Sequence, residues 1–200
     1  MSGSTSALEP VLGGRLDAVW LAYGRRPSGP PPRRWRGLAG YGRLDIAARV
    51  LLAALYPGGT LEEDSALLVY LDSDKPLLLV FEPGCLPEGI LYEHESGEVL
   101  LQVLRGRQSR RAEPAPPLPE LLALLRARGY QVLQLSEKGE RLQGHRPGTV
   151  YLLGLRVDPP EGLPVDGYAS IGPCSYLASH VAAYINALKR LTRRPGPSQP

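Results

Sequence analysis

Short apolar segments that alternate with amphipathic ones constrain the fold of this chain more than any other feature. Six apolar segments have the length of buried strands: 17–24, 66–71, 76–81, 130–135, 149–155 and 168–172. Four other segments carry apolar residues at helical spacing: 45–56, 96–106, 119–128 and 173–191. Strands that alternate with helices predict an α/β domain with a largely parallel sheet.

The length of 200 residues fits one domain with a sizeable core. We expect a single domain over 17–192, with 1–16 as a flexible N-terminal extension and 193–200 as a disordered tail. The polar stretch 72–75, DSDK, has the composition of a hairpin turn and predicts that the strands around it pair antiparallel.

Several classes of protein are disfavoured by the sequence. The longest apolar run, LLLVF, is too short to span a bilayer, and the first residues lack the basic and apolar regions of a signal peptide. We therefore expect a cytoplasmic protein with no membrane contact. Two cysteines and three histidines are scattered without ligand spacing, so we expect neither a metal site nor a disulfide: Cys85, Cys174, His94, His145 and His180. Phosphate-loop, dinucleotide-binding and serine-hydrolase motifs are absent from the sequence.

Two basic, proline-rich stretches stand out at 25–37 and 105–119. The first holds five Arg, four Pro and Trp35 but no acidic residue, which excludes a helix or an inner strand. Arginine forks suit RNA phosphates, and an aromatic ring suits a stacked base. Solvated arginines that only maintain solubility are the alternative. We favour RNA contact through this loop, at Arg25, Arg26, Arg33, Arg34, Trp35 and Arg36.

Small or turn-forming residues follow three of the expected strands, in the segments 135–139, 154 and 170–175. The carboxyl ends of parallel strands are where α/β sheets bind ligands. Backbone groups at such ends can bind an adenine edge, although plain turns would show the same pattern.

The glycine-flanked pair Arg43 and Asp45 stands directly before the helix expected at 45–56, and a second copy of the motif, GRLD, occupies 14–17. Asp45 can simply cap the helix, since its carboxylate can accept orphan backbone N–H bonds. Alternatively, Arg43 holds an RNA phosphate or base, and Asp45 helps a proton to leave. The first copy is expected to precede a strand, so the two copies need not be equivalent.

Four stretches of the chain resemble the TrmY family of SPOUT methyltransferases, which methylate N1 of the pseudouridine at position 54 of archaeal tRNA. GYGRLDIAARVLLAAL is similar to the family's glycine-flanked G-R-L-D before an apolar helix, and VYLLG to its strand that ends in Gly. LQLSEKGERL is similar to its strand followed by a polar turn, and SIGPCSYLASHVAAYINALKR to its S-L-S-P loop and last helix. Order and spacing agree over roughly 18–191.

This resemblance implies a SPOUT-type domain whose C-terminal segment forms a trefoil knot, a homodimer formed through the first and last helices, and S-adenosyl-L-methionine as cofactor. It also implies the function: a methyltransferase for N1 of pseudouridine in tRNA, with catalytic roles for Arg43 and Asp45. Carried over by position, the cofactor site comprises Leu135, Gly154, Ile171, Gly172, Pro173, Cys174, Ser175, Tyr176 and Val181.

The chain differs from the family after the strand glycine, where the family has G-D-x-x-G. Here Arg156 takes the acidic position and Pro159 and Pro160 follow. Two alternatives are therefore kept. One is the related family that makes the same modification in small-subunit ribosomal RNA, and the other is a catalytically silent RNA-binding paralogue.

Overall fold

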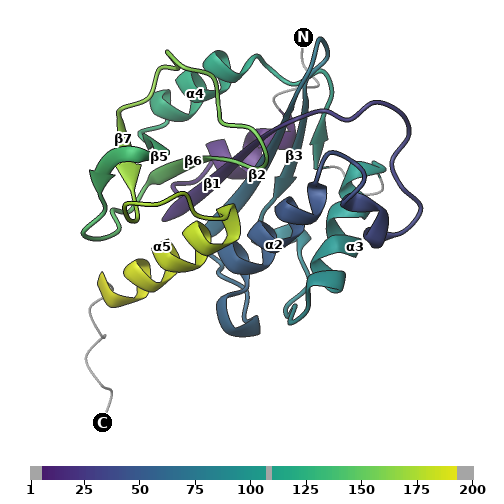
Figure 1. Ribbon diagram of the computed structural model, residues 1–200, viewed down its shortest axis with the longest axis horizontal. Helices are drawn as coiled ribbons and strands as arrows, with labels where there is room; N and C mark the ends of the chain where they lie inside the picture. Colours follow the sequence, from purple (N-terminus) through teal and green to yellow (C-terminus); the bar gives the residue numbers. More distant parts are fainter. Residues whose placement is uncertain (1–5, 107–109, 193–200) are drawn as a thin grey trace.

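The computed structural model describes residues 6–106 and 110–192 and has a mixed sheet at its centre (Figure 1). The strand order is β4-β3-β2-β1-β6-β5-β7. The bounds are Ala18–Arg25 for β1, Ser65–Asp72 for β2, Leu77–Phe81 for β3, Arg111–Ala112 for β4, Gln131–Arg141 for β5, Thr149–Gly154 for β6 and Gly167–Ser170 for β7.

Parallel pairing dominates the sheet, as the sequence predicts. β1 pairs in parallel with β2 and β6, and β5 pairs in parallel with β6 and β7. β2 and β3 form the expected antiparallel hairpin across 72–75, and β3 pairs antiparallel with β4. The carboxyl ends of β1, β5, β6 and β7 therefore lie along one edge of the sheet.

Helices cover both faces of the sheet (Figure 1). On one face, α2 (Leu44–Leu55), α3 (Glu93–Leu104) and α5 (Ala178–Thr192) enclose a core around Trp20 and Tyr151. On the other face, α1 (Glu9–Leu12) and α4 (Leu118–Ala127) pack on alternate residues of the same strands, such as Val19 and Leu21. Short 3₁₀ segments connect these elements: η1 at Ser6–Leu8, η2 at Trp35–Leu38, η3 at Pro57–Gly59 and η4 at Pro83–Cys85.

The expected flexible extension at 1–16 is wrong for the residues that the structure describes. Residues 6–12 are helical, and four of their side chains are buried beneath α4: Ala7, Leu8, Val11 and Leu12. The hydroxyl of Tyr130 donates to the carbonyls of Val11 and Gly14, which fixes the segment further. The apolar spacing here spans barely one turn, which is too short to show a helical period. Residues 1–5 and the tail expected at 193–200 lie outside the described residues.

Other boundaries differ from the prediction by a few residues. α3 begins at Glu93 rather than at 96, because the Glu95 carboxylate accepts from the backbone N–H groups of Leu91 and Tyr92 and closes the first turn. α5 begins at Ala178, so residues 173–177 belong to a loop. β5 runs past the expected polar turn and continues to Arg141.

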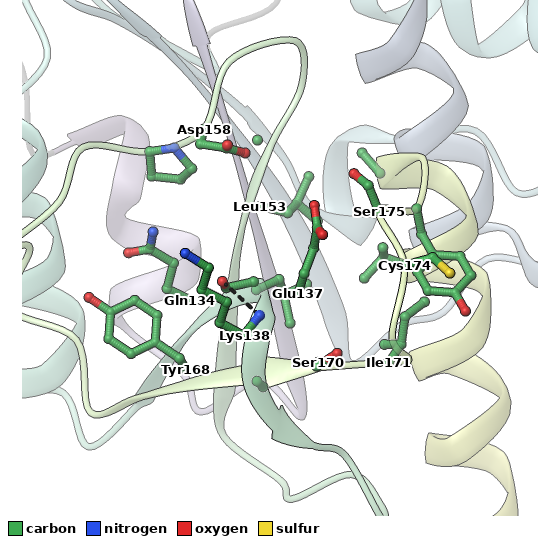
Figure 2. Close-up of a pocket in the computed structure, with 18 of the residues that line it drawn as sticks. Gln134, Glu137, Lys138, Leu153, Asp158, Tyr168, Ser170, Ile171, Cys174 and Ser175 are labelled. Atoms are coloured by element: carbon green, nitrogen blue, oxygen red, sulfur yellow. Dashed lines mark hydrogen bonds between the residues drawn. The ribbon is translucent and has the colours of Figure 1, made fainter.

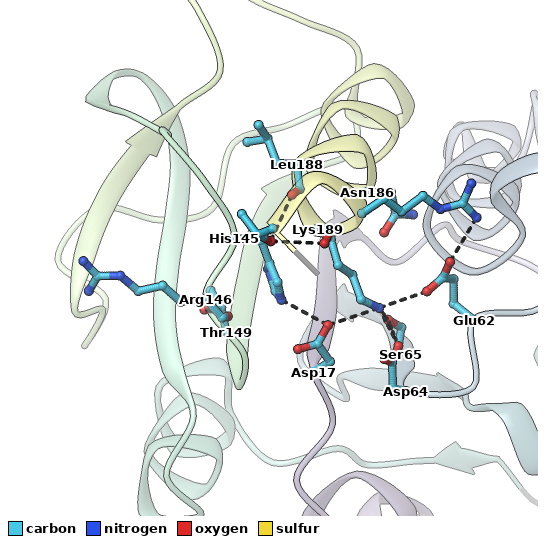
Figure 3. A network of polar contacts seen from close by, with 12 residues as sticks. Asp17, Glu62, Asp64, Ser65, His145, Arg146, Thr149, Asn186, Leu188 and Lys189 are labelled. Carbon is cyan, nitrogen blue, oxygen red and sulfur yellow. Dashed lines mark hydrogen bonds and ion pairs between the residues drawn. The ribbon is translucent and has the colours of Figure 1, made fainter. Parts of the chain in front are cut away.

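The second half of α5 is fixed at the amino edge of the sheet by a buried cation (Figure 3). The Lys189 Nζ atom lies 3.1 Å from Glu62 Oε2, 2.7 Å from Ser65 Oγ and 3.4 Å from Asp17 Oδ2, and it also contacts Asp64. Asp17 and Asp64 stand directly before β1 and β2. The side chain of Lys189 is only 1% exposed, so this cluster holds a charge that water does not solvate.

Within the described residues, none of the helices combines the length and the apolar content needed to cross a bilayer.

Candidate functional site

A pocket of about 730 Å³ opens where β5, β6 and β7 end, beside the first turn of α5 (Figure 2). This volume falls in the range of pockets that bind small molecules and cofactors. The site coincides with the edge at which the sequence predicts a ligand crevice.

Seven of the nine residues expected to bind the cofactor lie in the lining of this pocket: Leu135, Gly154, Ile171, Cys174, Ser175, Tyr176 and Val181. Gly172 and Pro173 are not among the lining residues. Gly172 instead shapes the turn, since Ser170 Oγ donates to its carbonyl at 2.6 Å and accepts from its N–H at 3.1 Å. A Cβ at Gly172 would lie 2.5 Å from the Tyr176 hydroxyl.

β5 bulges away from β7 at the pocket. Leu135 and Glu140 both pair with Ala169, so the four residues 136–139 project from the ladder between them. Gly139 makes this path possible, because a Cβ there would lie within 2.7 Å of three backbone atoms of Ala169. The bulge brings Ser136, Glu137 and Lys138 to the pocket lining.

Gly154 allows the loop after β6 to fold back over the strand end. A Cβ at this position would lie 2.5 Å from the Val157 carbonyl oxygen and 3.2 Å from the Asp158 Cα. The loop places Asp158 in the pocket lining, whereas Arg156 is exposed and is not part of that lining. The pocket wall therefore carries an acidic residue after β6, although the sequence has Arg at the position where the resembled family has its acid.

The remaining polar lining comes from residues that the sequence does not single out individually for this site. Gln134, Lys138, Asp158 and Tyr168 lie on the side of the pocket away from α5, and Glu137 lies between them and Ser175 (Figure 2). No short motif marks them, because they come from three separate strand ends. For Glu137, Lys138 and Asp158 the one signal is a position beyond the end of an expected apolar strand, whereas Gln134 and Tyr168 lie within strands and carry no such signal.

Arg43 and Asp45 form a bidentate ion pair, with Nε to Oδ1 at 2.9 Å and Nη2 to Oδ2 at 3.0 Å. Asp45 is 6% exposed and also contacts Arg49, whose Nε binds Glu93 on α3 at 3.0 Å. The hydrogen bonds from Arg43 hold the pKa of the Asp45 carboxyl below its usual value. A carboxylate held in this way acts better as an orienting acceptor than as a proton sink.

Asp45 does not stand at the N-cap position of α2, but it lies in the first turn, where its carboxylate also accepts a backbone N–H. The residue at the N-cap of α2 is Arg43, in a left-handed conformation with φ 61°, and its side chain makes no capping hydrogen bond. Neither Arg43 nor Asp45 lines the 730 Å³ pocket. The second GRLD copy precedes β1, as expected, and its Asp17 contacts Lys189 and His145.

Searches with the sequence give no relative: no family model matches it, and no curated protein matches it. A search of solved structures does find matches. Nep1 from Archaeoglobus fulgidus, solved bound to S-adenosylhomocysteine, aligns with a TM-score of 0.57 at 17% identity and covers 90% of this chain and 99% of that one. This chain has a SPOUT-type fold.

A second solved structure gives a weaker alignment. The SpoU methyltransferase AviRb from Streptomyces viridochromogenes, in complex with AdoMet, matches with a TM-score of 0.47 at 15% identity, over 90% of this chain and 61% of that one.

The basic loop of this SPOUT-type domain packs beside the GRLD segment. The Tyr41 hydroxyl donates to the Gly29 carbonyl, and Gly42 approaches Pro27 so closely that a Cβ would lie 2.5 Å from its ring. Of the six residues expected to bind RNA, four are exposed: Arg25, Arg33, Arg34 and Arg36. The other two have structural contacts. Arg26 pairs with Glu113 and donates to the Lys75 carbonyl, and Trp35 is half-buried against Gly97 of α3.

A second groove lies between α2 and α5. Arg49, Leu52 and Ala53 line it from α2, and His180, Ala183 and Asn186 line it from α5. Within the described residues, no group of three His, Cys, Asp or Glu side chains is arranged to hold a metal ion.

Proposed function

We propose that this protein is an S-adenosyl-L-methionine-dependent RNA methyltransferase that methylates N1 of pseudouridine, at position 54 of tRNA. The observation that carries the proposal is the pocket at the ends of β5, β6 and β7, in a fold shared with a protein solved with S-adenosylhomocysteine. Strand-end pockets in parallel sheets are the usual ligand sites of α/β domains.

The pocket suits this cofactor in shape and chemistry. Leu153, Ala178 and Val181 give an apolar wall for the purine of the cofactor, while Gln134 and Asp158 give acceptors for hydrogen-bond donors elsewhere in the cofactor. Gln134 Oε1 is buried and has no hydrogen-bond partner among the described residues. A ligand donor would therefore satisfy a group that the folded chain leaves unpaired.

The bound cofactor supplies an electrophilic methyl group on sulfur. The chain would then align N1 of the base with that methyl group; as the bond from N1 to the methyl carbon forms, the methyl–sulfur bond would break to leave the thioether, and the N1 proton would pass to solvent. In this proposal Asp45 orients the N1–H of the base, and Arg43 both holds the Asp45 carboxylate in place and offers its exposed edge to an RNA phosphate.

The exposed arginines beside GRLD fit an RNA backbone. Each single replacement by Ala removes one phosphate contact, at Arg33, Arg34 or Arg36. The slope of log RNA affinity against log salt should then become shallower by about 0.9 or less for each replacement. Replacing Arg26 should instead reduce stability, since its guanidinium bridges two separate loops.

The assembly proposed with this function is a homodimer through α2 and α5, with the segment 149–191 knotted. The groove between those two helices supports the first part. The strand order supports the proposed knot. After β5 the chain forms β6 on one side of β5 and then β7 on the other side of β5, and α5 then packs on α2. An experimental structure in which α5 packs without threading through a loop would contradict the knot.

Three candidate functions are separated by two measurements. Calorimetric titration with S-adenosyl-L-methionine should show binding and a raised Tm, as mass action requires of a native-state ligand. Nucleoside analysis after incubation with unmodified tRNA and small-subunit ribosomal RNA should then find 1-methylpseudouridine in tRNA. Methylation of the ribosomal RNA alone would favour the related family. Binding of RNA without any cofactor binding would indicate a silent RNA-binding protein.

A further inference from the structure

Gln134 is an unusual residue for its position. It lies in β5, next to the edge strand β7, at a position that pairs with Leu152 of β6 and Tyr168 of β7. Its side chain is 7% exposed and lines the pocket. Its Oε1 atom is fully buried, and no donor reaches it within the part of the chain that the structure describes. A buried acceptor without a donor is costly, and a ligand in the pocket that Gln134 lines can supply that donor.

The pocket has different chemistry on its two sides (Figure 2). Ile171, Cys174 and Ser175 lie toward α5, where Ala178 and Val181 add an apolar wall. Gln134, Lys138, Asp158 and Tyr168 lie on the opposite side, away from α5. A ligand that fits both sides carries an apolar ring at one end and a zwitterion at the other.

We propose that Gln134 is the residue that recognises the amino-acid end of the cofactor, with its Oε1 accepting a hydrogen bond from the α-ammonium group. This inference rests on the proposed function, since it assumes the adenosyl cofactor. Asp158 then adds a negative charge near the ammonium group, and Lys138 adds a positive charge for the carboxylate. The purine lies on the side of α5.

A neutral amide suits this task better than a carboxylate would. A buried carboxylate would have to lose its hydration even in the empty pocket, whereas an amide loses much less. Gln134 thus provides an acceptor for a cation without a buried negative charge in the empty pocket. The exposed carboxylates of Asp158 and Glu137 supply the long-range attraction instead.

The test compares two ligands that differ only at the amino-acid end. S-adenosylhomocysteine and 5′-methylthioadenosine are both uncharged at sulfur, but only the first carries the ammonium and carboxylate groups. In Gln134→Leu, calorimetry should show S-adenosylhomocysteine binding weakened by about 10- to 100-fold, the size of a hydrogen bond to a charged group. Binding of 5′-methylthioadenosine should stay within about twofold of its original value, on the same scale.

Two further variants keep the test decisive. Gln131→Leu changes the same residue type in the same strand outside the pocket lining, and it should alter neither affinity. Gln134→Glu keeps an acceptor oxygen. Compared with Gln134→Leu, it should therefore bind S-adenosylhomocysteine more tightly relative to 5′-methylthioadenosine.

Each contrary result overturns a specific statement. Equal weakening of both ligands in Gln134→Leu would show that Gln134 contacts the adenosyl part or only shapes the pocket, and would overturn the inference. No weakening of either ligand would overturn it too. If the unaltered protein binds neither ligand, the proposed cofactor is wrong, and the inference falls with it.

Discussion

At the residue scale, the GRLD motif turns from a sequence pattern into a defined ion pair. Asp45 is buried, and both of its carboxylate oxygens face guanidinium groups. Arg43 keeps its left-handed backbone in the helix-entry turn after Gly42. A buried acid with two cationic neighbours at the start of a helix is a suitable group for orienting a proton donor.

The first prediction concerns Asp45→Asn. This change keeps the shape of the side chain but removes its charge, so single-turnover methyl transfer should fall by about 10²–10⁴. The affinity for S-adenosyl-L-methionine should hardly change, because Asp45 does not line the pocket. Glu93→Gln is the matched control, because Glu93 and Asp45 both pair with Arg49, and this variant should keep the original rate of methyl transfer. Methyl transfer by Asp45→Asn at close to the original rate would assign the motif to helix entry alone.

The second prediction concerns Gly154→Ala. The new methyl group would lie 2.5 Å from the Val157 carbonyl oxygen, so the loop that carries Asp158 must shift. We expect a loss of about 1–3 kcal/mol in the free energy of unfolding, together with weaker ligand binding. Gly14→Ala is the control, because its Cβ would meet nothing within 4 Å. Urea denaturation and calorimetry measure the two effects, and an unchanged ligand affinity would contradict this role of the loop.

At the scale of elements, the sequence locates strands and helices well wherever a segment is long enough to show its apolar pattern. β2, β3 and β6 are buried along nearly their whole length and read as continuous apolar runs. The patterns fail where the structure depends on distant partners. The helices at 6–12 are too short to show a period, and the bulge at 136–139 depends on the close approach of Gly139 to Ala169.

The candidate site shows the same division. Gly154 and the segment 170–175 can be predicted from the sequence, because turn residues after apolar strands mark a sheet edge. Gln134 could not be predicted as a site residue, because a single polar residue in an apolar strand has the pattern of an ordinary solvent-facing position. Its burial is visible only in the fold, where it lines the pocket together with Asp158 and Tyr168.

The third prediction concerns the attachment of α5. Lys189→Met removes the cation that faces Asp17, Glu62 and Asp64, and leaves those carboxylates close together. We expect the free energy of unfolding to fall by about 3 kcal/mol, the lower end for breaking a buried ion pair, because Asp64 stays partly exposed. Arg190→Met removes a half-exposed cation that also faces Glu62, and should cost less than about 1 kcal/mol. Equal costs in urea denaturation would contradict a special role for Lys189.

At the scale of the whole molecule, the groove between α2 and α5 leads to the fourth prediction. Sedimentation at micromolar concentration should show a dimer. His180→Glu on that groove should weaken the dimer, because it adds a buried charge to the interface. His94→Glu, on the exposed side of α3 outside the groove lining, is the control. A monomer in the unaltered protein would contradict the proposed assembly.

The fifth prediction is a loss of stability on acidification. His145 is buried, its Nδ1 lies 2.8 Å from the Tyr151 hydroxyl and its Nε2 3.3 Å from Asp17, and burial lowers the pKa of its imidazole. The unfolded chain therefore binds this proton more readily than the folded one. Stability should be complete above a pH of about 6.5 and should decline as the pH falls from there toward the lower pKa of the folded state.

Urea denaturation at pH 8 and at pH 5.5 measures this decline. His145→Gln should reduce the difference between the two pH values, whereas His180→Gln should leave it unchanged because His180 is exposed. An identical pH dependence in the His145→Gln variant would assign the acid sensitivity to other groups.

α5 joins two chemically different ends of the sheet. Its first turn lines the pocket, and eleven residues later Lys189 sits in the charged cluster next to Asp17, the partner of His145. A rise of 1.5 Å per residue separates them by about 16 Å along one stiff element. A ligand in the pocket would stabilise the packing of α5, and protonation of His145 would weaken it. Ligand binding and proton binding then oppose each other, and this coupling is reciprocal. We therefore expect ligand binding in the acid range where stability declines to release protons, so that the heat of binding will depend on the ionisation enthalpy of the buffer.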